Sequence, residues 1–275
     1  MVLDYAKGND FNHWMIKNYE YFDWQNKLVL LFNVIRGLKE IHQRNMVHHD
    51  FHTGNILLCV SFLLESIITD DDILISDMGL SGNIGDTNQD NVCGIMPYVA
   101  PEVLKGIPYT QAADIYSFGM IMYFVVTGKQ PFEDRAHDHN LAKDIFKGIR
   151  PEINEPLAPK CYIDLMERCW DLNQYNRPNT TEVFEFISLF LRSYFHKSGS
   201  RDHEIEKQFN EAEEYRRINL SSTKVSKSLT STHPQAIYKS RFLNPLVEEL
   251  PKDDIDKYKI TDDMDVDFCS LIEEN

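Results

Sequence analysis

The sequence has 275 residues, of which 43% are hydrophobic and 26% are charged, and its formal net charge is -15. This hydrophobic fraction excludes a wholly disordered chain, and the acidic balance argues against nucleic acid as the main partner, because a phosphate-binding surface needs positive potential. The five cysteines are widely spaced and form no Cys-x-x-Cys pair, which argues against a zinc ribbon or a disulfide framework.

The elements predicted before residue 195 are mainly helices. Apolar residues recur at steps of three and four between Leu28 and Ile41, which predicts an amphipathic helix. The segment from Asp114 to Thr127 is apolar on nearly every face, so we expect a helix buried at the centre of the fold. Short strands are expected around Ile56–Cys59 and Ile73–Ser76, and further helices around Leu141–Lys147, Lys160–Asp171 and Thr180–Ser193.

The composition changes from Lys197 onward. Residues 201–217 are dense in charge with a thin apolar stripe, which predicts at most a marginal helix. Residues 220–232 are rich in Ser, Thr and Lys, as flexible linkers are, and the segment from 248 to 275 holds 11 acids against three lysines. We therefore divide the chain into a domain of residues 1–195 and a charged tail of residues 196–275 that we expect to be largely disordered.

Five short motifs follow one another at characteristic distances. They are His48-His49-Asp50-Phe51-His52-Thr53-Gly54-Asn55, Ile75-Ser76-Asp77-Met78-Gly79, Pro97-Tyr98-Val99-Ala100-Pro101-Glu102, Asp114-Ile115-Tyr116-Ser117-Phe118-Gly119, and Arg177-Pro178 after Cys169-Trp170. Each motif alone is weak, but their order and spacing together are specific. The sequence resembles the protein kinase family over residues 1 to about 193, specifically its C-terminal lobe. The motifs around Arg150, Cys169 and Arg177 are most similar to the tyrosine-kinase-like branch, whose members mostly phosphorylate Ser and Thr.

The resemblance implies a mainly α fold, a helical bundle with a small β-hairpin catalytic region, with the N-terminal lobe absent from this chain. It implies transfer of the γ-phosphoryl group of ATP to Ser or Thr hydroxyls of protein substrates, with Mg²⁺ as the metal. Asp50 would orient the substrate hydroxyl and accept its proton, whereas Asn55 and Asp77 would hold Mg²⁺. The residues implied to bind the nucleotide are Leu57, below the adenine, and Val2, Asp4 and Ala6 in the hinge. The alternative for Asp50 and Asp77 is that of plain turn residues, which their joint spacing disfavours.

The resemblance also implies two structural contacts. Glu102 should form a buried two-pronged pair with Arg177, because a guanidinium group binds a carboxylate through two parallel hydrogen bonds. Asp114 should accept backbone N–H groups from the loop that contains His48 and Asp50. His137 and His139 lie in a polar loop, where we expect solvated side chains rather than a metal site.

The sequence also departs from the family. It contains no G-x-G-x-x-G motif, and neither the strand Lys nor its partner Glu is recognisable. Because about half of the nucleotide cleft depends on these parts, we expect this chain alone to be weakly active or inactive. His49, His52 and Ile95 stand where Arg, Lys and Thr are usual. The change at His49 argues against control by phosphorylation, the change at His52 predicts weaker stabilisation of the phosphate charge, and the change at Ile95 leaves the substrate class open. Met78 replaces the commoner Phe or Leu, and residues 59–72 form an unusually long connection.

Two further hypotheses remain beside the enzyme. One is a non-catalytic kinase-fold module (a pseudokinase), which binds a partner protein through the face around Gly94–Ile107 and the helix near Leu141–Ile149. The other is that the tail docks substrates or enters the cleft of a neighbouring kinase. For the enzyme the expected partners are a protein substrate and ATP, without nucleic acid or membrane. The charged start and the absence of a long apolar run predict a cytoplasmic protein, with a nuclear location left open.

Overall fold

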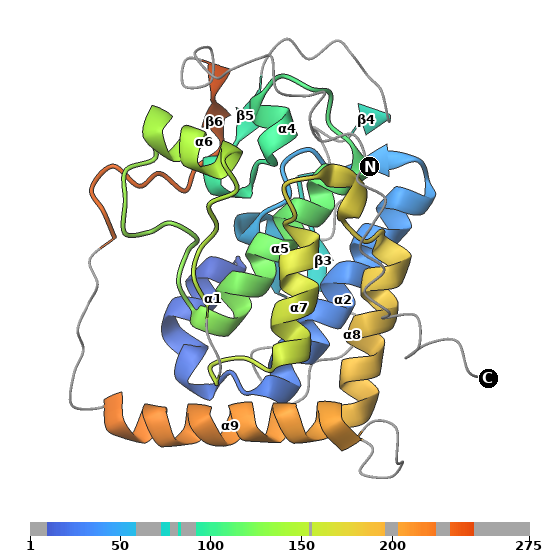
Figure 1. The fold of residues 1–275 in the computed structure, drawn as a ribbon, viewed down its shortest axis with the longest axis vertical. Helices are drawn as coiled ribbons and strands as arrows, with labels where there is room; N and C mark the ends of the chain where they lie inside the picture. The colour runs from blue at the N-terminus through green and yellow to red at the C-terminus, as the bar shows by residue number, and fades with distance from the viewer. Residues whose placement is uncertain are drawn as a thin grey trace.

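The computed structural model describes residues 10–58, 73–77, 82–83, 92–153, 156–195, 203–223 and 232–244, and the described part is mainly helical (Figure 1). The α-helices are α1 (Phe11–Asn18), α2 (Trp24–Gln43), α4 (Pro101–Leu104), α5 (Gln111–Thr127), α6 (His139–Phe146), α7 (Lys160–Cys169), α8 (Thr180–Phe195) and α9 (His203–Thr223). The strands are β1 (Met46–Val47), β2 (Ile56–Leu58), β3 (Ile73–Ile75), β4 (Gly82–Asn83), β5 (Cys93–Gly94) and β6 (Arg241–Phe242), and the 3-10 helices are η1 (Tyr19–Tyr21), η2 (Thr53–Asn55), η4 (Met96–Tyr98) and η5 (Gln174–Asn176). Within these ranges no helix is both long enough and apolar enough to cross a bilayer.

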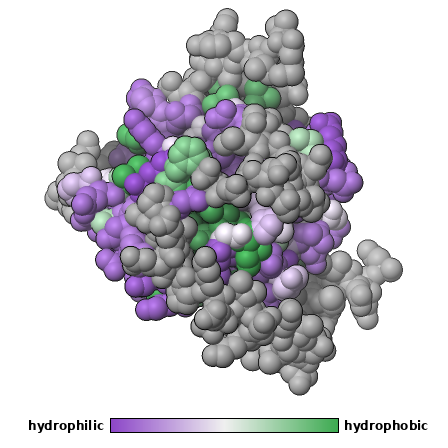
Figure 2. All heavy atoms as spheres, turned by 90° about the horizontal axis from the view of Figure 1, so that it is seen from above, coloured by the Kyte–Doolittle hydropathy of each residue, from purple (hydrophilic) through white to green (hydrophobic). Residues whose placement is uncertain are grey.

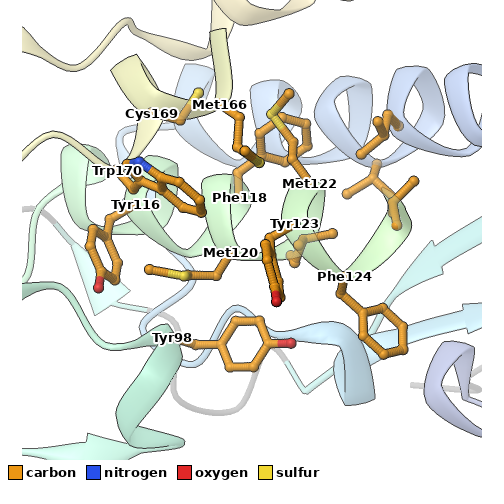
Figure 3. Packing of buried hydrophobic residues seen from close by; sticks show 14 of the residues in the cluster. Tyr98, Tyr116, Phe118, Met120, Met122, Tyr123, Phe124, Met166, Cys169 and Trp170 are labelled. Carbon is orange, nitrogen blue, oxygen red and sulfur yellow. The ribbon is translucent and has the colours of Figure 1, made fainter. Parts of the chain in front are cut away.

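Helix α5 runs through the centre of the fold, as its apolar sequence predicts. Every residue from Ala113 to Val126 is buried, and Figure 3 shows its Phe118, Met120 and Met122 among side chains of neighbouring segments. The helix ends at Gly128, which has a φ of 67° in the left-handed region that favours glycine. A Cβ atom there would lie 2.8 Å from the ring of Tyr19, so both the backbone and the packing require glycine.

Helix α2 carries the periodic apolar face that the sequence predicts. Its N-cap is Asp23, whose side chain accepts the backbone N–H of Asn26. The buried face packs on α8 and on α5, with Leu31 and Leu38 fully buried. Helices α2, α5 and α8 therefore form the frame that supports the loops at one end of the molecule (Figure 1).

The described strands form three short antiparallel pairs, β1–β4, β2–β3 and β5–β6. In the β2–β3 pair, Leu57 lies opposite Leu74. Ile56 and Leu58 are fully buried on one face, whereas Leu57 between them is half-buried, as the alternation of a strand requires. This pair matches the two strands predicted from the sequence, and it presents Leu57 on the face away from the core.

Helix α9 differs from the expectation of a marginal helix in a disordered tail. It crosses the base of the fold (Figure 1, orange) and buries Phe209 completely. The ring of Phe209 lies 5.2 Å from that of Trp24 and 5.5 Å from that of Phe190, and Glu213 accepts the backbone N–H of Trp24. One buried Phe contributes about 1.5–3 kcal/mol, so a thin apolar stripe is enough when other helices supply an aromatic pocket.

A second tail segment, residues 232–244, also lies against the body of the fold, where it contributes β6. The other tail residues, including the acidic end, lie outside the described residues. On the face seen in Figure 2, the coloured residues are mostly hydrophilic, with hydrophobic residues in small groups. Large exposed hydrophobic side chains such as Ile16 and Tyr21 are scattered, which is normal for a protein surface.

Lys27 is an unusual member of the core. Its side chain is only 2% exposed, and its Nζ lies 5.2 Å from the ring centroids of both Tyr19 and Trp24. Burial, and then repulsion by Arg216, lower the pKa of Lys27 to about 7, against the opposing attraction of Glu213. The folded state therefore holds a neutral amine at alkaline pH, whereas the unfolded chain keeps the proton up to its ordinary pKa of 10.5.

We expect replacement of Lys27 by Met to change how stability depends on pH. At pH values between the folded and the unfolded pKa of Lys27, the unfolded state holds more protons than the folded state. The free energy of unfolding of the wild type therefore rises with pH in this range. The Met variant lacks this gain and should be more stable than the wild type at about pH 6, by about 1–4 kcal/mol. Urea unfolding from about pH 6 to about pH 10 measures the difference, with Lys17→Met, at an exposed position of α1, as the control. A constant difference between wild type and Lys27→Met at all pH values would contradict this.

Candidate active site

The loop between β1 and β2 is held by one buried carboxylate. Asp114, in the first turn of α5, is fully buried. Its Oδ2 accepts the backbone N–H of His48 at 2.8 Å, and its Oδ1 accepts that of His49 at 3.3 Å. The Nε2 atom of His42 lies 2.9 Å from Oδ2. The predicted role of Asp114 is confirmed, and its hydrogen bonds fix the backbone that precedes Asp50.

Two residues of the site have backbone conformations that are rare outside glycine. His49 has a φ of 71° and Asp77 a φ of 63°. Left-handed conformations of this kind cost about 1–2 kcal/mol per residue. Such residues often cluster at active sites. The hydrogen bond from the His49 N–H to Asp114 holds the first of them in place.

Asp50 has a buried carboxylate that is tied to two side chains. Its Oδ2 accepts a hydrogen bond from the hydroxyl of Ser240 at 2.6 Å and lies 3.5 Å from Nε2 of His52. Burial alone would raise the pKa of Asp50, but the hydrogen bonds and charge of His52, together with the hydrogen bond of Ser240, outweigh it and hold this pKa below its ordinary value. The carboxylate is therefore ionised at neutral pH and is an acceptor for hydroxyl protons.

The orientation of His52 follows from a local turn. Its Nδ1 accepts the backbone N–H of Gly54 at 3.0 Å, so in the neutral ring the proton is on Nε2. That N–H faces both the carboxylate of Asp50 and, at 3.3 Å, the hydroxyl of Ser240. A Cβ atom on Gly54 would lie 2.9 Å from the His52 ring, which explains a glycine at this position.

Asn55 connects the loop to the segment that contains Asp77. Its side-chain Nδ2 donates to the backbone oxygen of Asp50 at 2.8 Å, so the amide oxygen points to the opposite side. The backbone oxygen of Asn55 accepts the N–H of Ser76 at 2.9 Å, and Ser76 O lies 2.9 Å from Nε2 of His48. These bonds bring Asp77, which is exposed, next to Asn55 and the Asp50 loop.

Asn55 and Asp77 carry the kind of side-chain oxygen that a magnesium site uses. Carboxylate and amide oxygens are ligands that Mg²⁺ accepts, and the ion completes its shell with phosphate oxygens and water. No cluster of three His, Cys, Asp or Glu side chains that could hold a metal by itself occurs among the described residues. A magnesium ion in this place would therefore depend on a phosphate ligand as well as on Asn55 and Asp77.

The predicted pair of Glu102 and Arg177 is confirmed. Two hydrogen bonds of 2.7 and 2.8 Å join the guanidinium group to the two carboxylate oxygens, and both residues are buried. Arg177 also donates to the backbone oxygens of Ala112 and Asp171. The pair anchors α4 beside the start of α5, and with it the segment that leads from β5 to α4.

Some predictions fall outside the described residues, and two others differ from the structure. Val2, Asp4 and Ala6, together with Met78 and Gly79, lie outside the described residues. In the face around Gly94–Ile107, which we expected to bind a partner, residues 95–104 are buried and the β5 edge is covered by β6. The expectation of solvated histidines is wrong for His137, which is 3% exposed because residues of the tail cover it.

Sequence reasoning missed two parts of the site. One is a hydrogen-bond chain in which the Tyr98 hydroxyl donates to Gln130, and Gln130 donates to Asn12 of α1. The other is Ser240, which lies 190 residues after Asp50. Tyr98 belongs to the predicted motif of residues 97–102, but Asn12, Gln130 and Ser240 carry no motif, and no spacing in the sequence places them beside the loop. Only the folded chain brings Gln130 to Tyr98 and Ser240 to Asp50.

The comparisons with known proteins agree with this geometry. Residues 1–186 match the model of the protein kinase domain. The chain belongs to the protein kinase family.

The sequence identities to individual relatives are low. The chain is 33% identical over 174 residues to the putative serine/threonine-protein kinase/receptor R831 of Acanthamoeba polyphaga mimivirus, which covers 62% of this chain and 10% of that protein. It is 26% identical over 199 residues to the serine/threonine-protein kinase STY17 of Arabidopsis thaliana, 70% of this chain and 32% of that protein. It is also 26% identical over 201 residues to the cyclic GMP-binding protein C of Dictyostelium discoideum, 70% of this chain and 7% of that protein. The chain thus spans a third or less of the length of these relatives.

We expect Asp114→Asn to destabilise the fold although it changes no apolar contact. The amide replaces an acceptor oxygen by a donor group, so one of the buried N–H groups loses its charged partner, at a cost of about 1.5–3 kcal/mol. Urea unfolding with tryptophan fluorescence measures this loss. The control is Asp144→Asn, which breaks the half-exposed pair with Arg135 and should cost less than about 1 kcal/mol. Equal stability of the two variants would show that the hydrogen bonds of Asp114 do not stabilise the loop.

Proposed function

We propose that the described domain is the C-terminal lobe of a protein kinase that transfers the γ-phosphoryl group of ATP to Ser or Thr hydroxyls of proteins. One observation carries this proposal: an ionised, buried carboxylate, Asp50, accepts a hydrogen bond from a serine hydroxyl at 2.6 Å. A kinase needs this contact at its acceptor, because the reaction depends on positioning the hydroxyl and receiving its proton. The relatives named as serine/threonine-protein kinases support the same acceptor class.

Each residue of the site has a role in this proposal. Asp50 orients the acceptor hydroxyl and accepts its proton. Asn55 and Asp77 hold Mg²⁺, which when bound bridges the nucleotide phosphates and offsets their charge. The half-buried Leu57 lies below the adenine, and Val2, Asp4 and Ala6 stay predicted nucleotide contacts. Assignment to the tyrosine-kinase-like branch and a cytoplasmic location also stay predictions.

His52 is one of the residues in which this site departs from the usual kinase motif. Ser/Thr kinases usually have a Lys there, close to the transferred phosphate. In this chain the Nε2–H of His52 faces the acceptor hydroxyl and the Asp50 carboxylate. We infer that His52 positions the hydroxyl together with Asp50.

The second candidate function is that of a kinase-fold binding module without catalysis. The observation in its favour is that the edge of β5 pairs with the extended segment of β6, so this fold binds a strand there without any reaction. The module hypothesis expects capture of a protein partner that is independent of Asp50 and Asp77. The enzyme hypothesis expects transfer that depends on both.

We expect Asp50→Asn to lower phosphoryl transfer by about 10²–10⁴-fold, because the amide cannot accept the hydroxyl proton. The assay uses the complete natural protein that carries this sequence, with Mg²⁺, ATP and a mixture of Ser- and Thr-containing peptides. Asp134→Asn, at an exposed acid outside the loop, is the matched control and should keep wild-type activity. Equal transfer by Asp50→Asn and wild type would refute the role of Asp50. Wild-type protein that binds its partner but transfers no phosphate would favour the module.

A further inference from the structure

The tail segment of residues 232–244 is bound to the candidate active site as an added strand. Strand β6 pairs antiparallel with β5, with Phe242 opposite Cys93 and Arg241 opposite Gly94 (Figure 1). The backbone N–H of Leu243 donates to the oxygen of Val92 at 2.8 Å, and Leu243 is fully buried. Addition of a strand to an exposed edge is a common way for a protein to bind an extended peptide.

The residues before Ser240 are anchored separately, on the connection between α5 and α6. The backbone N–H of His137 donates to the oxygen of Gln235 at 3.0 Å, and the N–H of His233 donates to the oxygen of Glu133 at 2.8 Å. The Tyr238 hydroxyl donates to the Pro131 oxygen at 2.9 Å, and the Tyr238 ring lies edge-on to that of His137 at 4.8 Å. Ser240 is therefore fixed from both sides.

Between these two anchors the hydroxyl of Ser240 meets the reacting groups of the candidate site. It donates to Oδ2 of Asp50 at 2.6 Å and lies 3.3 Å from Nε2 of His52. The next residue, Arg241, donates a hydrogen bond from its side chain to the backbone oxygen of His137 at 2.7 Å. Ser240 as a residue is exposed, whereas the hydrogen bond of its hydroxyl to Asp50 is half-buried. An acceptor hydroxyl within hydrogen-bond reach of the base has the geometry of a substrate.

We propose that Ser240 is a phosphorylation site that the active site of the same chain modifies, with residues 232–244 bound as an intramolecular substrate. The inference rests on the proposed function. In the reaction, Ser240 Oγ forms a bond to the γ-phosphorus of ATP, and the bond between this phosphorus and the bridging oxygen breaks. The hydroxyl proton passes to the Asp50 carboxylate, ADP leaves with the bond electrons, and no further reactant is needed.

The product has an electrostatic consequence for the docked segment. A phosphoserine carries a charge of about −1.5 to −2 at pH 7. It would stand beside the Asp50 carboxylate, and like charges at this distance repel strongly where solvent is limited. The phosphorylated segment therefore leaves the site, and the groove along β5 opens to protein substrates. Before phosphorylation, the docked tail competes with those substrates.

The docked register can be tested without catalysis. Phe242→Cys places a thiol opposite Cys93 in an antiparallel pair, where Cα separations fall within the range that a disulfide spans. Mild oxidation at alkaline pH should cross-link these two residues, which peptide mapping identifies. Lys239→Cys, on the same segment but outside the β5–β6 pair, is the matched control, and Phe242→Cys with Cys93→Ser excludes other thiols. Equal cross-linking to Cys93 from positions 239 and 242 would overturn the docked register.

Phosphorylation is tested in the complete natural protein with Mg²⁺ and ATP, with site mapping by mass spectrometry and a Ser/Thr peptide mixture as a separate acceptor. We expect phosphate on Ser240 at an initial rate per molecule that does not change on dilution of the protein. Ser240→Ala should abolish this signal and Ser240→Thr should keep it, whereas Thr232→Ala, at the other end of the docked segment, should change nothing. The Phe242→Cys variant, once phosphorylated on Ser240, should no longer form the cross-link between positions 93 and 242.

The outcomes separate this inference from the proposed function. Transfer to the peptides with no phosphate on Ser240 overturns the inference and leaves the proposed function standing. A Ser240 rate that rises with protein concentration also overturns it, since a second copy then acts on the tail. The absence of transfer to both peptides and Ser240 overturns the two together. The cross-link would then show whether the tail is a non-reacting occupant of the groove.

Discussion

The site depends on one buried anion, the Asp114 carboxylate at the head of α5. An isolated charge in a core costs several kcal/mol, and here the backbone N–H groups of His48 and His49, together with the ring of His42, satisfy it. Its place in the first turn of a helix adds a favourable dipole. Because the two backbone donors belong to the loop, the same bonds that stabilise the anion fix the path of the chain into Asp50. Stability and site geometry are therefore coupled at this carboxylate.

From that point the site is assembled by short polar links between segments far apart in the sequence. Asn55 donates to the backbone of Asp50, and Ser76 donates to the backbone of Asn55. On the other side, the pair of Glu102 and Arg177 fixes the segment after β5. The β5 edge that results is a binding surface for an extended peptide, and the chain's own tail lies on it with a hydroxyl at Asp50. The tail is thus placed as a ligand of the site.

The sequence predicted those parts whose signal is local or repeated. Periodicity indicated α2 and the buried α5, and the motifs indicated the contacts of Asp114 and the pair of Glu102 and Arg177, all of which the structure confirms. It did not predict that α9 would dock, because a single Phe209 is a weak periodic signal and its aromatic pocket comes from α2 and α8. The docking of Ser240 is more difficult to predict from the sequence. The pairing with β5 is made by backbone hydrogen bonds, which depend little on the identity of the side chains.

Binding of a nucleotide with Mg²⁺ is the property on which the catalytic assignment of Asp50, Asn55 and Asp77 depends most directly. Calorimetric titration of ADP into the complete natural protein, with and without Mg²⁺, measures it. We predict binding that requires Mg²⁺ and that Asp77→Asn weakens by about 10-fold or more, while the exposed Asp134→Asn variant binds as the wild type does. Nucleotide binding that is independent of Mg²⁺ and of Asp77, or no nucleotide binding at all, would contradict the assignment.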